Sequence, residues 1–193
     1  MNLELLKQLR ITTGVSISMC KDALVKSEWD FEKAKTLLRS MGNDFLEEAQ
    51  KEETPNGLIE CYLHHNKQVA VMIEIRCQTD FTARILSDFA RAICMQIAAT
   101  NPEFISERDV PKERINSEKL RVLEEMEAQE KPEEAISSIV KNRMKRFYME
   151  HCLLSQKSVH NSLITVRDYL NDKIKQTGEN IMIVRFVRYQ VGG

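Results

Sequence analysis

The feature that most constrains the fold is an apolar run from Val69 to Ile75, which is interrupted only by Glu74. Val or Ile occupies every second position of this run. Side chains that branch at Cβ favour extended backbone, so the run predicts a β-strand that is mostly apolar on both faces. Such a strand needs a partner strand beside it.

That partner strand precedes the run. Residues 58–63 mix apolar and polar side chains as a half-buried strand does, and His64-His65-Asn66-Lys67 supplies a polar turn, so we expect a hairpin. The adjacent histidines raise the alternative of a metal site. Neighbouring residues on a strand point to opposite faces, and no third ligand lies nearby, so we interpret both histidines as turn residues.

The first 42 residues predict three short helices, each with one apolar stripe. Trp29, between the second and third helices, is expected to fill the core. Three stripes of this kind suit a compact three-helix domain over residues 1–42. The side chains expected to face inward are Leu3, Leu6 and Leu9, then Ile17, Cys20, Ala23 and Leu24, and finally Phe31, Ala34, Leu37 and Leu38.

The ends of these helices are marked by residues with suitable capping chemistry. Ser16 and Asp30 can accept hydrogen bonds from the first turn of the second and third helices. Gly14 and Gly42 stand where the first and third helices should stop, because glycine adopts the left-handed backbone that ends a helix. The predicted domain therefore has defined boundaries for each of its helices.

Residues 43–56 are polar and largely acidic, and we predict a helical connector that stops at the turn signal Pro55-Asn56-Gly57. Residues 57–193 are predicted to form one core domain. Helical spacing and β-branched residues predict its later elements at residues 87–100, 111–130, 132–153, 165–178 and 181–191, the last being a strand. This order favours an α+β fold with an antiparallel sheet over a doubly wound sheet.

The helices predicted at 111–130 and 132–153 each begin with a proline and should form a helical hairpin. A basic stretch on the second of them is interpreted as a solvated face. The expected inward residues are Leu120, Leu123 and Met126, then Ile136, Ile139, Val140 and Phe147, and the basic stretch comprises Lys141, Arg143, Lys145 and Arg146.

The charge balance excludes several classes of partner. Lys and Arg number 28 and Asp and Glu number 29, so the net charge is −1. This balance gives no electrostatic basis for direct binding to nucleic acid or to an anionic membrane.

The N-terminus begins with an amphipathic pattern, and the five cysteines are widely spaced with no C-x-x-C pair. We therefore expect a cytoplasmic protein with reduced thiols.

The motifs of common enzyme classes are absent from the sequence: it has no phosphate-binding glycine loop, dinucleotide-binding turn, H-E-x-x-H helix or G-x-S-x-G elbow. Asp80, His64 or His65 and a cysteine could be combined into a hydrolase, but no spacing requires it. We expect a binding protein and not an enzyme, with no catalytic residue, metal site or cofactor of its own.

The junction Cys77-Gln78-Thr79-Asp80-Phe81-Thr82 joins the apolar strand to the helical region and allows two interpretations. In the first, Asp80 caps a short turn that begins at Phe81, while Phe81 covers the sheet edge. In the second, the segment offers Phe81 to a partner. The residues alone leave both interpretations open.

Several segments resemble the elongation factor Ts family, and they occur in the family's order over nearly the whole chain. Each segment is short, but the set together is specific. The segments are Leu9-Arg10-x-x-Thr13-Gly14, Cys20-Lys21-x-Ala23-Leu24, Asp30-x-Glu32-Lys33-Ala34, Cys77-Gln78-Thr79-Asp80-Phe81, Asn101-Pro102-Glu103-Phe104-Ile105, Arg143-Met144-Lys145-Arg146-Phe147 and Val184-Arg185-Phe186-Val187-Arg188-Tyr189-Gln190-Val191-Gly192.

The resemblance implies a ubiquitin-associated-like domain at the N-terminus and a function as a guanine-nucleotide exchange factor. The implied partner is the translational GTPase elongation factor Tu, whose own magnesium and nucleotide site would receive the loop of Thr79, Asp80, Phe81 and Thr82. This implication favours the second interpretation of the junction. Docking of the N-terminal domain on the same partner would involve Arg10, Thr13, Gly14, Cys20 and Lys21.

Longer members of the family carry two related core subdomains, whereas this chain resembles a short, one-core form. The resemblance therefore implies a homodimer, in which the final strand or nearby helices complete the missing half. The alternative to an exchange factor is a binding adaptor or scaffold that keeps the fold and has lost exchange activity.

Overall fold

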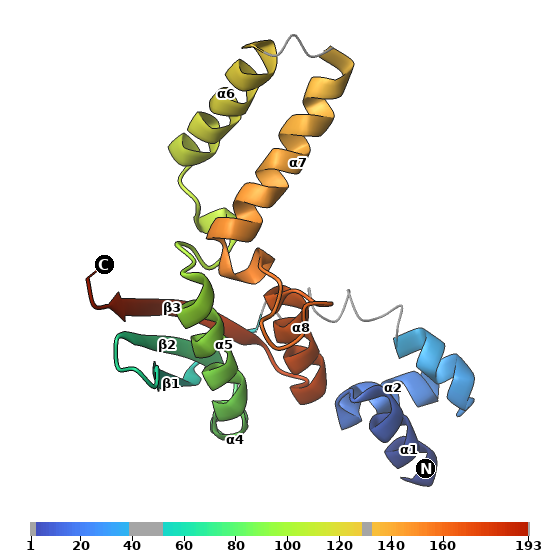
Figure 1. Cartoon of the computed structure of the whole chain (residues 1–193). Helices are drawn as coiled ribbons and strands as arrows, with labels where there is room; N and C mark the ends of the chain where they lie inside the picture. Colours follow the sequence, from blue (N-terminus) through green and yellow to red (C-terminus); the bar gives the residue numbers. More distant parts are fainter. Residues whose placement is uncertain (1–2, 39–51, 129–132, 193) are drawn as a thin grey trace. The chain divides into compact units, whose positions relative to one another are not determined.

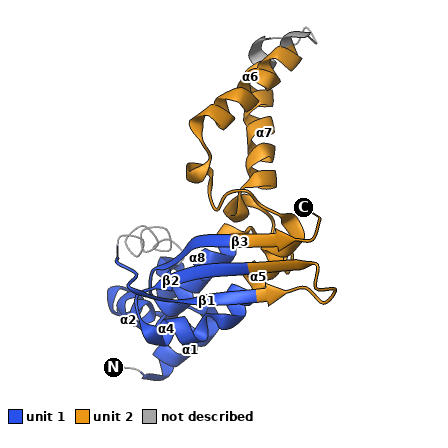
Figure 2. Cartoon of the chain, turned by 90° about the vertical axis from the view of Figure 1, so that its left-hand side faces the viewer, with its two compact units in different colours: residues 1–61, 72–91, 168–186 blue, residues 62–71, 92–167, 187–193 orange. Residues whose placement is uncertain are grey.

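The computed structural model of the protein describes residues 3–38, 52–128 and 133–192 (Figure 1). Gly42 and residues 43–51 of the predicted connector lie outside these ranges. The chain packs into two compact units that interleave along the sequence (Figure 2). Unit 1 comprises residues 1–61, 72–91 and 168–186, and unit 2 comprises residues 62–71, 92–167 and 187–193. The predicted boundaries at 1–42, 43–56 and 57–193 stay predictions.

The N-terminal part of unit 1 holds the expected helices α1 (Leu3–Thr13) and α2 (Ile17–Lys26), followed by helical residues 31–38. Partly buried Trp29 packs against their common core, as predicted. The fully buried members of this core are Leu9, Cys20, Ala23, Leu24 and Ala34, and Leu6, Met19 and Leu38 are nearly so.

The predicted caps of this region are confirmed. The Ser16 side chain accepts a hydrogen bond from the Met19 N–H at 3.4 Å, and an Asp30 carboxylate oxygen accepts one from the Lys33 N–H at 3.0 Å. Gly14 has a φ of 68° and ends α1 in the left-handed conformation. The expectations for Leu3 and Ile17 were wrong, since Leu3 is 52% and Ile17 is 51% exposed. Leu3 is the first residue of α1, whose buried stripe begins at Leu6. Ile17 is the first residue of α2, and the buried stripe begins two residues later.

A three-stranded sheet has the order β1-β2-β3, with β1 at Asn56–Leu63, β2 at Val69–Cys77 and β3 at Ile181–Gln190. The His64 N–H donates to the Val69 carbonyl and closes the predicted hairpin. The Val191 N–H donates to the Gln68 carbonyl, so the end of β3 lies beside the start of β2. The sheet is therefore antiparallel, and the predicted α+β fold class is confirmed.

The strand β2 buries only one of its two faces, and the open face also carries the charged Glu74 and Arg76. Val71, Ile73, Ile75 and Cys77 are at most 2% exposed, whereas Met72 on the opposite face is 46% exposed. Successive residues of a strand point to opposite sides, so the burial pattern gives the sheet one covered and one open face.

The predicted Pro-Asn-Gly turn was wrong, because Asn56 and Gly57 are the first two residues of β1. A Cβ atom on Gly57 would lie only 2.3 Å from the Ile75 carbonyl oxygen. Glycine at this position therefore permits the close approach of two strand backbones instead of a turn. Its φ is not positive, unlike that of Gly14.

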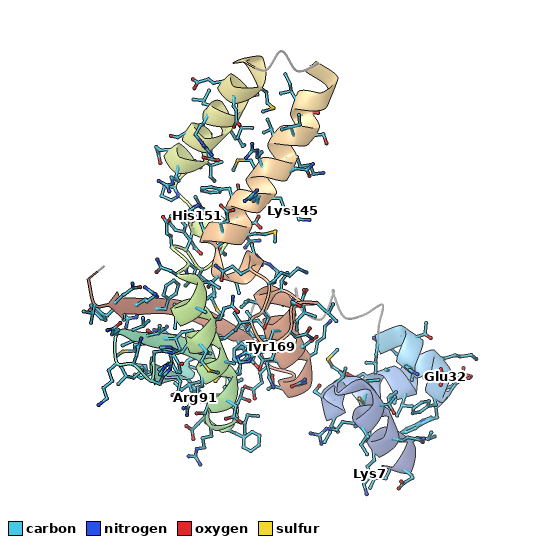
Figure 3. All side chains as sticks on the ribbon, in the orientation of Figure 1. Lys7, Glu32, Arg91, Lys145, His151 and Tyr169 are labelled. Carbon is cyan, nitrogen blue, oxygen red and sulfur yellow. The ribbon has the colours of Figure 1, made fainter. Side chains whose placement is uncertain are left out.

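Four helices lie close to their predicted ranges: α5 at Ser87–Thr100, α6 at Lys112–Ala128, α7 at Glu133–His151 and α8 at Val166–Thr177. The short turn expected after the junction is the helix α4 at Asp80–Ile85, and short 3-10 helices occur at Glu107–Asp109 and Leu153–Ser155. Within unit 1, α5 and α8 contact each other through Phe89 and Tyr169, whose ring centroids are 5.0 Å apart. Figure 3 labels Tyr169 on α8. This aromatic contact fixes α8, at whose end Gly178 has a φ of 78°.

The helices α6 and α7 of unit 2 form the predicted hairpin (Figure 1). An ion pair between Arg143 and Glu125, at 3.3 Å, links the two helices. The prediction for Leu120 was wrong, since it is 58% exposed, while Val122 and Met126 are buried. Val122 and Met126 are one helical turn apart and lie on the same face of α6. Leu120 lies on the opposite face, about half a turn around the helix axis. The predicted basic stretch from Lys141 to Arg146 is solvated, as expected.

At the base of this hairpin His151, the last residue of α7, lies 2.7 Å from a Glu103 carboxylate oxygen, and its ring packs 4.6 Å from that of Phe147 (Figure 3). Phe147 belongs to an apolar cluster with Val110, Met144 and Cys152. No helix within the described residues is long and apolar enough to cross a membrane.

A buried polar network inside unit 2 centres on Gln96, which is 1% exposed. Its side-chain nitrogen donates to Gln156 at 3.0 Å and to the Lys157 carbonyl at 3.1 Å, and its side-chain oxygen accepts from the Val159 N–H at 2.7 Å. The Gln156 side-chain oxygen also accepts a hydrogen bond from the Thr100 hydroxyl at 2.7 Å. The Gln96 amide itself is buried, and a buried amide without partners is unfavourable. Gln96 therefore holds the segment that follows α7 against α5.

Replacing Gln96 with Leu should destabilise the protein by about 2–4 kcal/mol, because buried donors and acceptors lose their partners. Urea unfolding followed by circular dichroism measures this change. The matched control is the exposed Gln190→Leu, which should change the free energy of unfolding by less than about 0.5 kcal/mol. Equal effects of the two substitutions would contradict the structural role given to Gln96.

Candidate functional site

The turn after β2 begins with a helix cap supplied by Thr79. Its hydroxyl oxygen accepts a hydrogen bond from the Thr82 N–H at 3.2 Å, and α4 starts at Asp80. The hypothesis that Asp80 caps the turn was wrong. A cap residue keeps extended backbone, which Thr79 has with φ −123° and ψ 153°, whereas Asp80 is already helical. The Asp80 carboxylate instead pairs with Arg84, one turn later, at 2.7 Å.

Phe81 is 72% exposed and lies in the first turn of α4. The hypothesis that it covers the sheet edge was therefore wrong. An aromatic side chain loses favourable burial when it stays in water. The structure thus holds a large apolar group on the surface, next to the Asp80 carboxylate.

Hydrogen bonds with three residues, Asn56, Cys77 and Glu179, fix where this turn leaves the sheet. The Asn56 side chain donates to the Gln78 carbonyl at 2.7 Å, and the Cys77 thiol lies 3.2 Å from the Thr79 carbonyl, which accepts its hydrogen. Burial raises the pKa of the Cys77 thiol, with the Glu179 carboxylate as the next cause, so this sulfur stays protonated and can donate. The third contact comes from Glu179.

Glu179 binds Thr79 with both oxygens of its carboxylate. The Thr79 N–H donates to one oxygen at 3.1 Å, and the Thr79 hydroxyl donates to the other at 2.8 Å. Hydrogen bonds to a charged acceptor are stronger than those between neutral groups. The cap residue of α4 is therefore held from outside the helix as well as from within.

The structure places the four loop residues expected to bind a partner in different environments. Asp80 and Phe81 lie side by side at the surface, and Thr79 is exposed but bound to Glu179. Thr82 is 2% exposed, so its side chain supports the turn from the inside. The surface that a partner could touch here consists mainly of Asp80 and Phe81.

The residues expected to bind a partner in the N-terminal domain also divide by burial. Arg10, Gly14 and Lys21 are exposed, whereas Cys20 is fully buried. The half-buried Thr13 donates its hydroxyl to the Leu9 carbonyl at 2.7 Å. Burial raises the pKa of the Cys20 thiol, opposed by its contact with Thr13 and by the charge of Arg10. Their part in binding stays a prediction.

Sequence reasoning missed Glu179 and Asn56 as parts of this site. Glu179 lies 100 residues beyond Thr79, and no periodic pattern links two such positions. The one local signal was Gly178, whose left-handed conformation ends α8 just before Glu179. For Asn56 the sequence predicts a turn, whereas the structure places it in β1. Among the residues that the structure describes, no group of three His, Cys, Asp or Glu side chains could hold a metal ion.

Comparison with known proteins shows the family to which the chain belongs. A family model described as "Elongation factor TS" matches residues 32–193, and one described as "UBA-like domain" matches residues 3–41. The protein "Elongation factor Ts" of Methylacidiphilum infernorum is 37% identical over 194 residues, covering 100% of this chain and 96% of its own length. The chain belongs to the elongation factor Ts family.

Two further members of the elongation factor Ts family also match nearly the whole chain. The protein of Caldanaerobacter subterraneus is 39% identical over 96% of this chain and 94% of its own length, and that of Petrotoga mobilis is 37% identical over 99% and 98%. The matched relatives are therefore similar in length to this chain, which belongs to a family of translation elongation factors. The ubiquitin-associated-like domain expected at the N-terminus is confirmed.

The thiols of this chain should differ sharply in reactivity. Cys61 is exposed, while Cys20, Cys77, Cys94 and Cys152 are buried. Burial raises the pKa of Cys152 to about 11, with nearby Glu107 as the next cause. The reactive species is the thiolate, so at pH 7 the native protein should expose one rapidly reacting thiol to a disulfide reagent.

Titration with such a reagent, before and after unfolding in urea, counts the thiols. We expect one fast thiol in the native protein and five in the unfolded protein. Cys61→Ala is the control and should remove the fast reaction. A second fast thiol in this variant would contradict the burial of the other cysteines.

Proposed function

We propose that this protein is a guanine-nucleotide exchange factor that promotes GDP release from elongation factor Tu. The observation that carries the proposal is Phe81, a large aromatic side chain presented at the surface on a turn that is held by several hydrogen bonds. A fixed apolar group of this kind can enter a partner without first paying the entropy of becoming ordered. Membership of the elongation factor Ts family supports this partner.

Exchange requires negative coupling between two ligands of the GTPase. A protein that binds the nucleotide-free state more tightly weakens nucleotide binding by the same factor. A thousandfold faster release takes roughly 4 kcal/mol, and full burial of one Phe yields only about 1.5–3 kcal/mol. Phe81 alone is therefore insufficient, and docking surfaces elsewhere, including the N-terminal domain with Arg10 and Lys21, must supply the rest.

In this proposal Phe81 enters between elements of the partner, while Asp80 brings a carboxylate close to the partner's own magnesium and nucleotide. The Asp80 carboxylate is exposed, and its ion pair with Arg84 lies on the surface, where such pairs are weak and easily exchanged. The protein acts by binding and not as an enzyme, in the cytoplasm, without a cofactor, a nucleic acid or a membrane.

Replacement of Phe81 with Ala should reduce the acceleration of GDP release by about 10- to 100-fold, the factor that corresponds to one buried aromatic side chain. Release of labelled GDP from elongation factor Tu, measured with and without this protein, tests the effect.

The matched control is Ile85→Ala, which removes a 54% exposed apolar side chain from the same helix. It should leave release nearly unchanged. Wild-type protein that does not accelerate release would eliminate the proposed function. Tight binding without acceleration would instead favour an adaptor or scaffold with the same fold.

We also propose that the protein forms a homodimer. On the part of the sheet that belongs to unit 1, apolar side chains of all three strands are exposed on the open face: Ile59 is 63%, Met72 is 46% and Met182 is 47% exposed. Exposed apolar side chains that gather on one face are typical of interfaces. A second copy of the chain, offering the same side chains, would cover them.

Sedimentation equilibrium at micromolar concentration should therefore give the mass of a dimer. Met72→Lys should shift the protein toward the monomer, because a charge would be buried at the interface. Leu120→Lys, at an exposed position of α6, is the control and should leave the mass unchanged. A monomeric wild-type protein would contradict the homodimer.

A further inference from the structure

The contact between Glu179 and Thr79 joins two parts of unit 1 that are distant in sequence. Glu179 follows α8, and Thr79 follows β2, yet the carboxylate accepts two hydrogen bonds from Thr79 at 2.8 and 3.1 Å. The Glu179 backbone is itself fixed, since Gly178 ends α8 and the Glu179 N–H donates to the Thr177 hydroxyl at 3.3 Å. The acceptor is therefore held by its own element.

The geometry of Thr79 makes this contact more specific than an ordinary surface hydrogen bond. The Thr79 hydroxyl has one hydrogen, which it donates to Glu179, so its lone pair stays directed at the Thr82 N–H. The Thr79 N–H points to the second carboxylate oxygen. One carboxylate thus fixes both the backbone and the side chain of the residue from which α4 starts, two positions before Phe81.

The contact contributes little to the free energy of folding of the whole protein, because Thr79 is exposed and Glu179 is only half-buried. Exposed polar contacts contribute little to the free energy of folding. Its effect should instead be local: without it, α4 keeps a cap but loses the fixed direction in which its first turn projects. The exposed Phe81 would then sample several orientations.

We propose that Glu179 is a positioning residue, which sets the orientation of Asp80 and Phe81 by holding Thr79. The inference rests on the proposed exchange function and deepens it. The carboxylate touches neither the partner nor its nucleotide, and it acts through the first turn of α4. A side chain already oriented for insertion enters the partner without an ordering cost, so the loss of Glu179 lowers the rate of nucleotide release.

The test compares Glu179→Ala and Glu179→Gln with the wild-type protein. Stopped-flow release of labelled GDP from elongation factor Tu gives the maximal rate at saturating factor and the concentration for half-saturation. We expect Glu179→Ala to lower the maximal rate about tenfold, the factor that one net hydrogen bond represents, with a smaller change in half-saturation. Glu179→Gln keeps one acceptor oxygen and should restore part of the rate.

Hydrogen exchange supplies a readout that needs no partner. The amide of Thr82, which donates to the Thr79 hydroxyl, should exchange faster in Glu179→Ala than in the wild-type protein. The control is Asp172→Ala, which removes an exposed carboxylate from α8 and should change neither exchange nor release. Thermal unfolding should show that all variants remain folded.

The outcomes separate this inference from the proposed function. Wild-type protein that fails to accelerate GDP release removes the proposed function, and the positioning role with it. Wild-type acceleration that Glu179→Ala leaves unchanged overturns the positioning role alone. Equal losses in Glu179→Ala and Asp172→Ala, or a loss explained by a lower unfolding temperature, would also overturn it.

Discussion

One-sided burial of β2 is the constraint on which the rest of the site depends. The face of the strand with Val71, Ile73, Ile75 and Cys77 is covered, whereas the opposite face carries Met72, Glu74 and Arg76. Because side chains alternate along a strand, the burial of Cys77 fixes the direction in which the chain continues. The cap at Thr79 follows two residues later, and Phe81 emerges at the surface two residues after the cap.

The position of Phe81 is stabilised by polar contacts and not by its own burial. Hydrogen bonds reach the segment from Asn56 before β2 and from Glu179 after α8, so both neighbouring regions of unit 1 hold the turn. A single exposed hydrogen bond contributes little to folding, but several that converge on one short segment restrict its orientation. The arrangement maintains an exposed aromatic side chain in a defined place, which folding alone would not favour.

In unit 2, buried hydrogen bonds likewise restrict the orientation of an irregular segment. Gln96 is almost fully inaccessible and satisfies polar groups of the segment after α7, including Gln156 and Val159. A buried amide is tolerated only when it is fully hydrogen-bonded, so the network selects one arrangement of this segment. Specific polar contacts therefore decide the course of irregular segments in both units, while apolar stripes place the helices and strands.

The sequence by itself determined the local structure: the hairpin from residue 58 onward, the order of helices, the caps at Ser16 and Asp30, and the family. These depend on periodicity and on hydrogen bonds between residues a few positions apart. It failed for Leu3, Ile17 and Leu120, whose burial depends on where neighbouring helices lie. It also failed for Gly57, whose role depends on the approach of β2.

Only the tertiary structure decided that Thr79 and not Asp80 caps α4, that Phe81 is exposed, and that Glu179 holds the turn. Sequence spacing carries no information about a contact between residues 100 positions apart. Such a contact exists because α8 ends beside the turn, and the packing of whole elements determines that juxtaposition.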